Sequence, residues 1–436
     1  MKWSRYNFLF HSEKISYALF NSRMLSFSIL DKKTYEILSA VKNDIHSVSS
    51  LLSQDEINRL KKKKVLVQDH EDDNYLGMLR YRKQLQSYTS KTLGMVVCPT
   101  LSCNFACPYC YEHNLPKSVM KPQTQQQMVD FINSHSFGKE NITLNWHGGE
   151  PLVAFKTMQQ IYSILEKQSK LPIGHSSMVS NGYLLTEEIC KYLEEKKLDY
   201  IQITIDGNKN THDKTRVLKN GGSSFNRIIE NIDMATELMP NCRIGVRTNI
   251  GRDNMDEYVD LYRQLTRRWK GKNCTVYHAY VLDNGINTCK EKRCALELTT
   301  KEKNNFEVML AKSGIRDKKS LFPKIDSGTY TCMDCDAFVT APDGTLYKCW
   351  ADVGIKERAI GSLASGVTNN KIVSQFMVGT DKFADTRCLN CGFLPICDGG
   401  CNLYRVGKIE KGIPYDVCNL DEQGLIHYLE TYLETV

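Results

Sequence analysis

The sequence lacks any run of about 18 apolar residues, so no helix is predicted to cross a membrane. The start of the chain, Met1 to Arg5, leads into no long apolar stretch and no small-residue cleavage site, which argues against a signal peptide. Internal repeats and low-complexity segments are also missing. No helix rich in Arg, Asn and Gln suggests base reading. We therefore expect a cytoplasmic protein with neither a membrane nor a nucleic acid as partner.

Cysteine, in contrast, is abundant, with 17 among 436 residues. Without an export signal, this number favours metal ligation in a reducing compartment over disulfides, and the odd count agrees. The chain is 41% hydrophobic and 25% charged, which is ordinary for a globular protein, and its length predicts two or three domains. The formal net charge is +7. Its one basic run, Lys61 to Lys64, is most simply a solvated helix end, with a docking patch for an acidic peptide as the alternative.

The central part of the chain, residues 92–282, alternates short β-rich runs with amphipathic helical patterns. Six strands are predicted, at 93–98, 142–147, 177–180, 200–206, 243–249 and 275–282. Helices are predicted between them, near 123–136, 155–169, 186–197, 224–238 and 254–268. This alternation predicts an α/β fold with a parallel sheet, either doubly wound or closed into a partial barrel. In both forms the chemistry is expected at the carboxyl ends of the strands.

The two ends of the chain follow other patterns. The first 75 residues predict a small winged-helix-like module, with β-like segments at 6–11, 16–21, 26–30 and 65–68 and helices near 31–42 and 53–63. Acidic residues at 69 and 71–73 then suggest a linker. The last stretch, from about 325, is Cys-dense and turn-rich, so we expect ligands to hold it more than an apolar core. The predicted division is 1–75, a linker at 76–91, a catalytic domain at 92–310 and a Cys-rich region at 311–436.

Cys103, Cys107 and Cys110 form a CxxxCxxC run directly after the first predicted strand of the sheet. An iron–sulfur cube normally takes four Cys ligands, so three leave one iron open. An open metal position is where a substrate or cofactor can bind. Zinc remains an alternative from the cysteines alone, because CxxC pairs also suit zinc.

Polar groups and glycines follow the other predicted strands. Gly148 and Gly149, with Glu150, follow the second strand, where paired glycines let a ligand approach the backbone, although such a pair can also be a simple tight turn. Further candidates for this rim are Asn181, Thr204, Asp206, His212, Asp213, Arg216 and Arg247. Such residues can also do no more than cap the next helix.

The CxxxCxxC run, with the aromatic Tyr109 before its last cysteine, resembles the signature of the radical SAM superfamily. Gly148-Gly149-Glu150 stands where that family has its Gly-Gly-Glu motif. The resemblance implies a partial (β/α)6 barrel in which Cys103, Cys107 and Cys110 hold a 4Fe–4S cluster and the Gly-Gly-Glu motif receives the amino group of SAM. It also implies reductive cleavage of SAM to a 5′-deoxyadenosyl radical. The other implied SAM contacts are Tyr109, Asn181, Thr204 and Arg216, with Thr204 and Arg216 near the ribose and carboxylate.

The cysteines near the end of the chain are similar in order and spacing to those of the SPASM domain. That resemblance implies two auxiliary 4Fe–4S clusters, one on Cys332, Cys335, Cys349 and Cys401, the other on Cys388, Cys391, Cys397 and Cys418. Each set has four thiolates and leaves no open iron, which suits electron transfer, and zinc is the alternative. Six cysteines then remain without a role: Cys98, Cys190, Cys242, Cys274, Cys289 and Cys294. Most of these are expected to be buried, while Cys289 and Cys294 could face a substrate.

The N-terminal module resembles the PqqD-like element that recognises precursor peptides by β-addition. The resemblance therefore implies a peptide maturase, which would form a thioether or carbon–carbon cross-link or an epimerised residue in a ribosomally made peptide. Its second partner would be an external one-electron reductant of the flavodoxin or ferredoxin type. The alternatives are an anaerobic sulfatase-maturating enzyme and a non-enzymatic electron carrier. In the sulfatase-maturating family an Asp follows an auxiliary-cluster cysteine, whereas Trp350 follows Cys349 here and Asp352 comes later.

Overall fold

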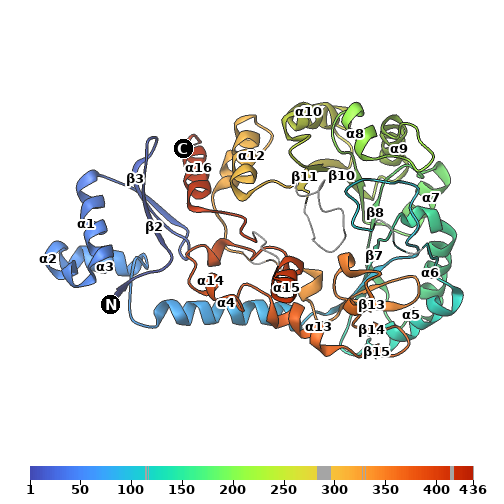
Figure 1. The fold of residues 1–436 in the computed structure, drawn as a ribbon, viewed down its shortest axis with the longest axis horizontal. Coiled ribbons are helices and arrows are strands. Elements are labelled where there is room, and N and C mark those ends of the chain that lie inside the picture. Colours follow the sequence, from blue (N-terminus) through green and yellow to red (C-terminus); the bar gives the residue numbers. More distant parts are fainter. Residues whose placement is uncertain are drawn as a thin grey trace.

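The computed structural model describes residues 1–112, 115, 117–281, 296–326, 328, 330–412 and 417–435. A ten-stranded sheet lies at its centre, and six of its strands are parallel and follow each other in chain order (Figure 1). These strands are β6 (Thr92–Val97), β7 (Asn141–Trp146), β8 (Ile173–Ser180), β9 (Tyr200–Thr204), β10 (Arg243–Ile250) and β11 (Cys274–Tyr280). The predicted α/β partial barrel is confirmed, although the last predicted strand ends at residue 282, outside the described residues.

Helices between these strands cover the outer face of the barrel. They are α5 (Pro122–Ser134), α6 (Phe155–Gln168), α7 (Glu187–Glu195), α8 (Lys209–Thr215), α9 (Phe225–Leu238) and α10 (Tyr258–Arg268). Side chains alternate along a strand, so one face of each strand meets the helices. Trp146 and Ile201 are fully buried on that helix-facing side. The opposite face is polar: Asn145 donates to Ser177 across 2.8 Å. The barrel interior is therefore suited to polar ligands.

The Cys-rich region is joined to the barrel through the barrel's first strand. Strand β12 (Ala337–Thr340) pairs in parallel with β6, and β13 (Thr345–Tyr347), β14 (Gly361–Ser362) and β15 (Gly366–Val367) continue the sheet in antiparallel order. Cys335 directly precedes this addition and Cys349 follows its second strand. After these strands the chain forms three short helices, α13 (Asn370–Ser374), α14 (Thr386–Leu389) and α15 (Asn402–Lys411). The first of these cysteines therefore lie at the barrel edge.

The N-terminal module contains the predicted strands and helices. Strands β2 (Asn7–Ser12), β3 (Ser16–Asn21) and β4 (Ser26–Leu30) form an antiparallel sheet, and β1 (Lys2–Trp3) pairs with β5 (Leu66–Val67). Helices α1 (Lys32–Asn43), α2 (Val48–Leu51) and α3 (Gln54–Lys62) pack on one face. Asp31 caps α1, and Ser53 with Glu56 forms a capping box on α3. These local signals explain why the elements begin where the sequence predicts.

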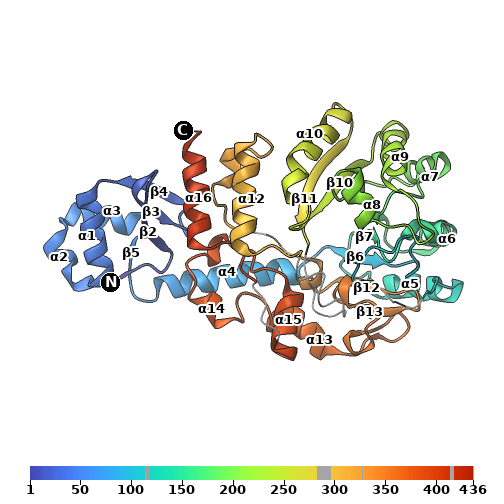
Figure 2. The same ribbon diagram turned by 45° about the horizontal axis from the view of Figure 1, so that its top comes forward.

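The other face of this small sheet packs on the end of the chain. Phe10 and Phe20 share a buried cluster with Leu425 and Leu429 of helix α16 (Glu422–Leu433). Figures 1 and 2 show α16 between the module and helix α12 (Thr300–Lys312). The two ends of the chain therefore form a common core, which no local sequence signal predicts. Among the described residues, no helix is long and apolar enough to cross a membrane.

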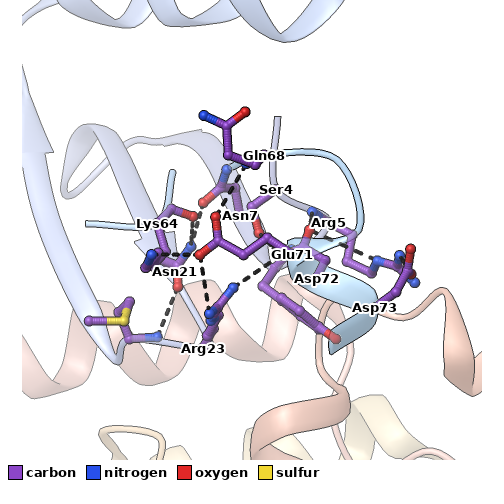
Figure 3. Close-up of polar contacts among 12 residues, drawn as sticks. Ser4, Arg5, Asn7, Asn21, Arg23, Lys64, Gln68, Glu71, Asp72 and Asp73 are labelled. Carbon is purple, nitrogen blue, oxygen red and sulfur yellow. Dashed lines mark hydrogen bonds and ion pairs between the residues drawn. The ribbon is translucent and has the colours of Figure 1, made fainter. Parts of the chain in front are cut away.

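Most of the predicted linker is helical. Helix α4 (Glu71–Tyr88) begins with the acidic residues, and negative side chains are favourable at a helix N-terminus. Asp72 is fully buried there and accepts hydrogen bonds from Ser4 Oγ at 3.1 Å and the Arg5 backbone N–H at 2.9 Å (Figure 3). Arg23 Nη1 lies 3.5 Å from the same carboxylate. The acidic run therefore fixes the module to α4 instead of remaining solvated.

Asp72→Ala should lower the free energy of unfolding by about 3 kcal/mol, because it leaves the donors of Ser4 and Arg5 without their acceptor and leaves Arg23 with Glu71 alone. Asp73→Ala is the matched control, since Asp73 also pairs with Arg5 but is half exposed. That control should cost no more than about 1 kcal/mol. Urea denaturation of the full chain measures both values. Equal losses for the two variants would contradict the role of Asp72.

Candidate functional site

The loop that carries Cys103, Cys107 and Cys110 follows β6 and is fixed across the barrel mouth. Ala106 N–H donates to the Val217 carbonyl at 2.7 Å, and Lys219 N–H donates to the Asn104 carbonyl at 3.0 Å. Burial raises the pKa of the Cys103 thiol to about 12 and that of Cys110 to about 11. Nearby carboxylates, Glu150 for Cys103 and Glu112 for Cys110, and neighbouring thiols contribute to these raised values. Such a group of buried thiols is suited to a cationic metal centre, which stabilises the thiolates.

Gly148 and Gly149 lie against the backbone that leads into this loop. Gly149 N–H donates to the Thr100 carbonyl at 3.2 Å, and Glu150 N–H donates to the Ser102 carbonyl at 2.9 Å. A Cβ atom on Gly149 would lie 2.5 Å from the Ser102 oxygen, and Gly148 has a φ of +114°. Only glycine allows this approach without displacing the loop. The two predicted motifs are therefore in direct contact.

Glu150 and Asn181 connect β7 and β8 to the same loop. Glu150 is buried and accepts hydrogen bonds from Ser180 Oγ at 2.8 Å and from the Asn181 N–H at 2.7 Å. Burial raises the pKa of Glu150. Asn181 Nδ2 donates to Asn104 Oδ1 at 2.7 Å, next to Cys103. The bonds to Ser180 and Asn181 hold the carboxylate in position beside the cysteines.

Arg216 and Tyr109 come together at the opposite side of the loop. Arg216 Nη1 donates to the Tyr109 hydroxyl at 3.0 Å, and this hydroxyl donates to Asp206. The Arg216 Nε and Asn104 Nδ2 atoms are buried, and neither has a hydrogen-bond partner among the described residues. Unsatisfied buried donors are costly, so a polar ligand at this position would stabilise them. This observation fits a bound SAM.

The other predicted rim residues separate into two groups. Thr204 is buried and lies beside Arg247 in the strand register, and Arg247 donates to Asn249 at 2.8 Å. His212 and Asp213, in contrast, bind backbone and side chains at the start of α9. Asp213 accepts from the N–H groups of residues 224 and 225 at 2.9 and 3.0 Å. Thr204 and Arg247 therefore remain candidates for ligand contact, while Asp213 is a structural cap.

Three residues at the barrel mouth were not predicted from the sequence. Glu112 is buried, and burial, with Glu150 nearby, raises its pKa to about 8. His147 Nδ1 lies 4.0 Å from Glu112 Oε1, and burial, with Arg247 nearby, lowers the pKa of His147 to about 4. The ring of Trp350, 44% exposed, stacks on His147 at a centroid distance of 5.8 Å. Trp350 follows Cys349, so the Cys-rich region reaches the barrel mouth here.

The cysteines near the end of the chain lie in two neighbourhoods. Burial raises the pKa of Cys349 well above its usual value, and charges on Asp352, Cys332 and Cys401 add to this effect. Burial also raises the pKa of Cys391 and raises that of Cys397 to about 11. Charge on Cys388 contributes to both raised pKa values. The remaining two predicted ligands are the half-buried Cys335 and the exposed Cys418. This grouping is compatible with the two predicted ligand sets, whose assignment stays a prediction.

Among the cysteines without a predicted role, Cys98, Cys190 and Cys242 are buried and Cys274 is partly buried. Cys289 and Cys294 lie outside the described residues, so their predicted exposure to a substrate stays a prediction.

Comparison with known proteins identifies the domain at this site. Residues 97–265, which include all three loop cysteines, match the model of the radical SAM superfamily. The chain contains a radical SAM domain. It is accordingly a radical SAM enzyme, and a 4Fe–4S cluster and SAM belong to its chemistry.

Three similar proteins extend the comparison beyond the radical SAM domain. A cysteine-type anaerobic sulfatase-maturating enzyme of Clostridium novyi is 24% identical over 74% of this chain and 91% of its own length. The radical SAM cyclopropyl synthase TigE of Paramaledivibacter caminithermalis is 21% identical over 91% of this chain and 87% of its own. The structure of Streptococcus suis SuiB bound to its precursor peptide SuiA aligns with a TM-score of 0.54 and 16% identity. This alignment covers 96% of this chain and all of SuiB.

Proposed function

We propose that this radical SAM enzyme is a maturase of a ribosomally made precursor peptide. It would form a thioether or carbon–carbon cross-link or an epimerised residue. The observation that carries the proposal is the N-terminal module, whose sheet has β4 at one edge, with no strand on its outer side among the described residues. The fold of SuiB, a protein that binds a precursor peptide, aligns with 96% of this chain. The sulfatase-maturating relative leaves about a quarter of the chain without a counterpart.

The edge of β4 offers a site for an extended peptide. An edge strand has free backbone N–H and C=O groups, and peptides commonly bind by adding a strand there. Ile29 of β4 is 59% exposed, and Lys63 Nζ lies 3.3 Å from Ser28 Oγ of the same strand. Lys63 belongs to the basic run that ends α3, in which Lys64 pairs with Glu71. An acidic precursor segment is therefore the preferred occupant of this edge.

The residues of the barrel mouth have defined parts in the proposed reaction. When bound, the cluster and SAM supply the 5′-deoxyadenosyl radical that takes a hydrogen atom from the peptide. Glu150 and the two glycines would hold the amino group of SAM, and Arg216 and Thr204 would contact its carboxylate and ribose. The Cys-rich region is proposed to be a SPASM domain, in which the two sets of four cysteines would hold auxiliary clusters suited to electron transfer. An external flavodoxin or ferredoxin is the proposed reductant, and the reducing cytoplasm the proposed location.

An anaerobic sulfatase-maturating enzyme is the second candidate, favoured by the long match to that relative. Two features oppose it. The expected position of the Asp of that family carries Trp350, which is engaged with His147. The nearby Asp352 is fully buried, and its Oδ1 lies 3.3 Å from Arg358 Nε. The Asp352 carboxylate is therefore held by Arg358.

Lys63→Glu tests the proposed peptide site. It should weaken binding of a fluorescent precursor peptide encoded by a neighbouring short reading frame by about tenfold, because like charges would meet at the edge strand. SAM cleavage without peptide should stay unchanged. Lys167→Glu is the matched control, because Lys167 is also an exposed lysine near the C-terminal end of a helix and lies far from β4 along the chain. Fluorescence anisotropy measures both affinities.

If Lys63→Glu binds the precursor peptide with unchanged affinity, the charge beside β4 has no part in peptide binding. Modification of a sulfatase peptide, with no effect on any precursor peptide, would instead establish the second candidate. Point substitutions are preferable to removal of residues 1–75, because the module shares its core with α16. Removal would expose Leu425 and Leu429 and disturb the Cys-rich region as well.

A further inference from the structure

Arg405 lies on α15, and its buried guanidinium points at a cysteine sulfur. Its Nη2 atom is 3.2 Å from Cys388 Sγ and 2.7 Å from the Gly399 carbonyl oxygen. Its Nε also donates to the Gly399 oxygen at 2.9 Å, and its Nη1 donates to Asp385 Oδ2 at 2.9 Å. The planar guanidinium is therefore fixed at both sides, so the N–H that faces the sulfur has a defined direction.

The turn between Cys397 and Cys401 makes this arrangement possible. Gly399 and Gly400 have φ values of +88° and +69°, a conformation that glycine adopts without strain. A Cβ on Gly400 would lie 2.3 Å from the Val417 carbonyl oxygen. Together the two glycines turn the Gly399 carbonyl toward Arg405, and the Gly399 N–H lies 3.3 Å from Cys397 Sγ. Two N–H groups therefore face sulfurs of one predicted ligand set.

The sulfurs of the other predicted ligand set also have backbone N–H donors, Ala351 at Cys349 and Leu403 with Tyr404 at Cys401, so the comparison concerns cationic side chains. Lys348 is buried next to Cys349, but its Nζ donates to the backbone carbonyls of Asp334 and Ala337. Within the described residues, no side-chain cation donates a hydrogen bond to the sulfur of Cys332, Cys335, Cys349 or Cys401. The two sets of cysteines therefore differ in a property that is known to tune iron–sulfur clusters. Hydrogen bonds to ligand sulfurs stabilise the reduced cluster, which carries one more negative charge.

We propose that Arg405 raises the reduction potential of the auxiliary cluster held by Cys388, and makes it the better electron acceptor of the two auxiliary clusters. The inference rests on the proposed function, because it requires that Cys388, Cys391, Cys397 and Cys418 hold such a cluster. Arg405 is a positioning residue here, since it acts through the Cys388 sulfur.

The test is a potentiometric titration followed by EPR, without peptide. The background is the full chain with Cys103, Cys107 and Cys110 replaced by Ala, reconstituted anaerobically, so that only the auxiliary clusters give signals. Arg405→Gln should lower one of the two midpoint potentials by at least ~59 mV, which is about a tenfold change in a one-electron equilibrium. Arg405→Lys, which keeps the positive charge but not the planar set of N–H donors, should give a smaller shift. The other midpoint should not move.

Arg387→Gln is the matched control. Arg387 pairs with the same Asp385 at 2.7 Å but is largely exposed, and among the described residues it donates no hydrogen bond to a sulfur. Its charge also acts on Cys388 and Cys418, but solvent and salt screen it, so its removal should shift the potential less. Unchanged midpoints in Arg405→Gln, with about 8 iron atoms retained, would overturn the proposal. If Arg405→Gln loses iron, Arg405→Lys is used in its place, and unchanged midpoint potentials in that variant would overturn the proposal. A background protein with about 4 iron atoms would instead refute the second cluster itself, whatever the peptide result.

Discussion

Replacing Cys103, Cys107 and Cys110 by Ala is expected to abolish formation of 5′-deoxyadenosine. These thiols are the three predicted ligands of the SAM-binding cluster, and the structure fixes their loop between the Gly-Gly-Glu turn and residues 217–219. Without the cluster, no electron can reach SAM, so the loss should be complete and not graded. Iron should fall from about 12 to about 8 atoms per chain, since one of three four-iron clusters is removed. Product chromatography and an iron assay measure the two effects.

Cys274→Ala is the control for this substitution. Cys274 lies at the start of β11 and belongs to no predicted ligand set. Its replacement should change neither the iron content nor the rate of SAM cleavage. Continued 5′-deoxyadenosine production by the triple variant would refute the ligand assignment, and about 8 iron atoms with zinc present in the unsubstituted protein would revive the alternative that the spacing alone allows.

The barrel was predictable because its signals are local. Strands such as β7 and β9 alternate in period 2 and most of the helices have an apolar stripe, so residues such as Leu144 and Ile203 show their burial in the sequence itself. Helix α4 was not predicted, because the acidic residues 71–73 suggested a linker. The donors that hold the buried Asp72 come from Ser4, Arg5 and Arg23, about fifty to seventy positions away. Their approach depends on the fold and leaves no local pattern.

The same distinction applies to the site. Motif spacing identified the cysteine loop and Gly148-Gly149-Glu150, and the structure brings them into contact. Glu112, His147 and Trp350 were not predicted, since Trp350 reaches His147 only through the pairing of β12 with β6. Asp213 was predicted as a rim candidate, but local hydrogen bonding at the start of α9 takes up its carboxylate. Polar residues after a strand therefore need the three-dimensional structure to separate ligand contacts from caps.

Gly149→Ala should reduce the rate of 5′-deoxyadenosine formation by at least about a hundredfold, the scale of effect that a 1 Å misplacement can have. The added methyl group would meet the Ser102 carbonyl oxygen at 2.5 Å and the Leu101 carbonyl oxygen at 2.7 Å. Both atoms are backbone, so a side-chain rotation cannot relieve the contact, and the segment leading to Cys103 must move. The initial rate with dithionite as reductant measures the effect.

Gly77→Ala is the matched control for this substitution, because a Cβ at that helical position meets nothing within 4 Å. It should leave the rate unchanged and can stabilise α4, since Ala is the better helix former. A Gly149→Ala rate within about twofold of the unsubstituted protein would show that the loop can shift without loss. The iron content separates two causes of a lower rate. Iron retained with weaker SAM binding places the fault in the Gly-Gly-Glu turn, whereas lost iron shows that this turn also holds the cysteine loop in its ligating position.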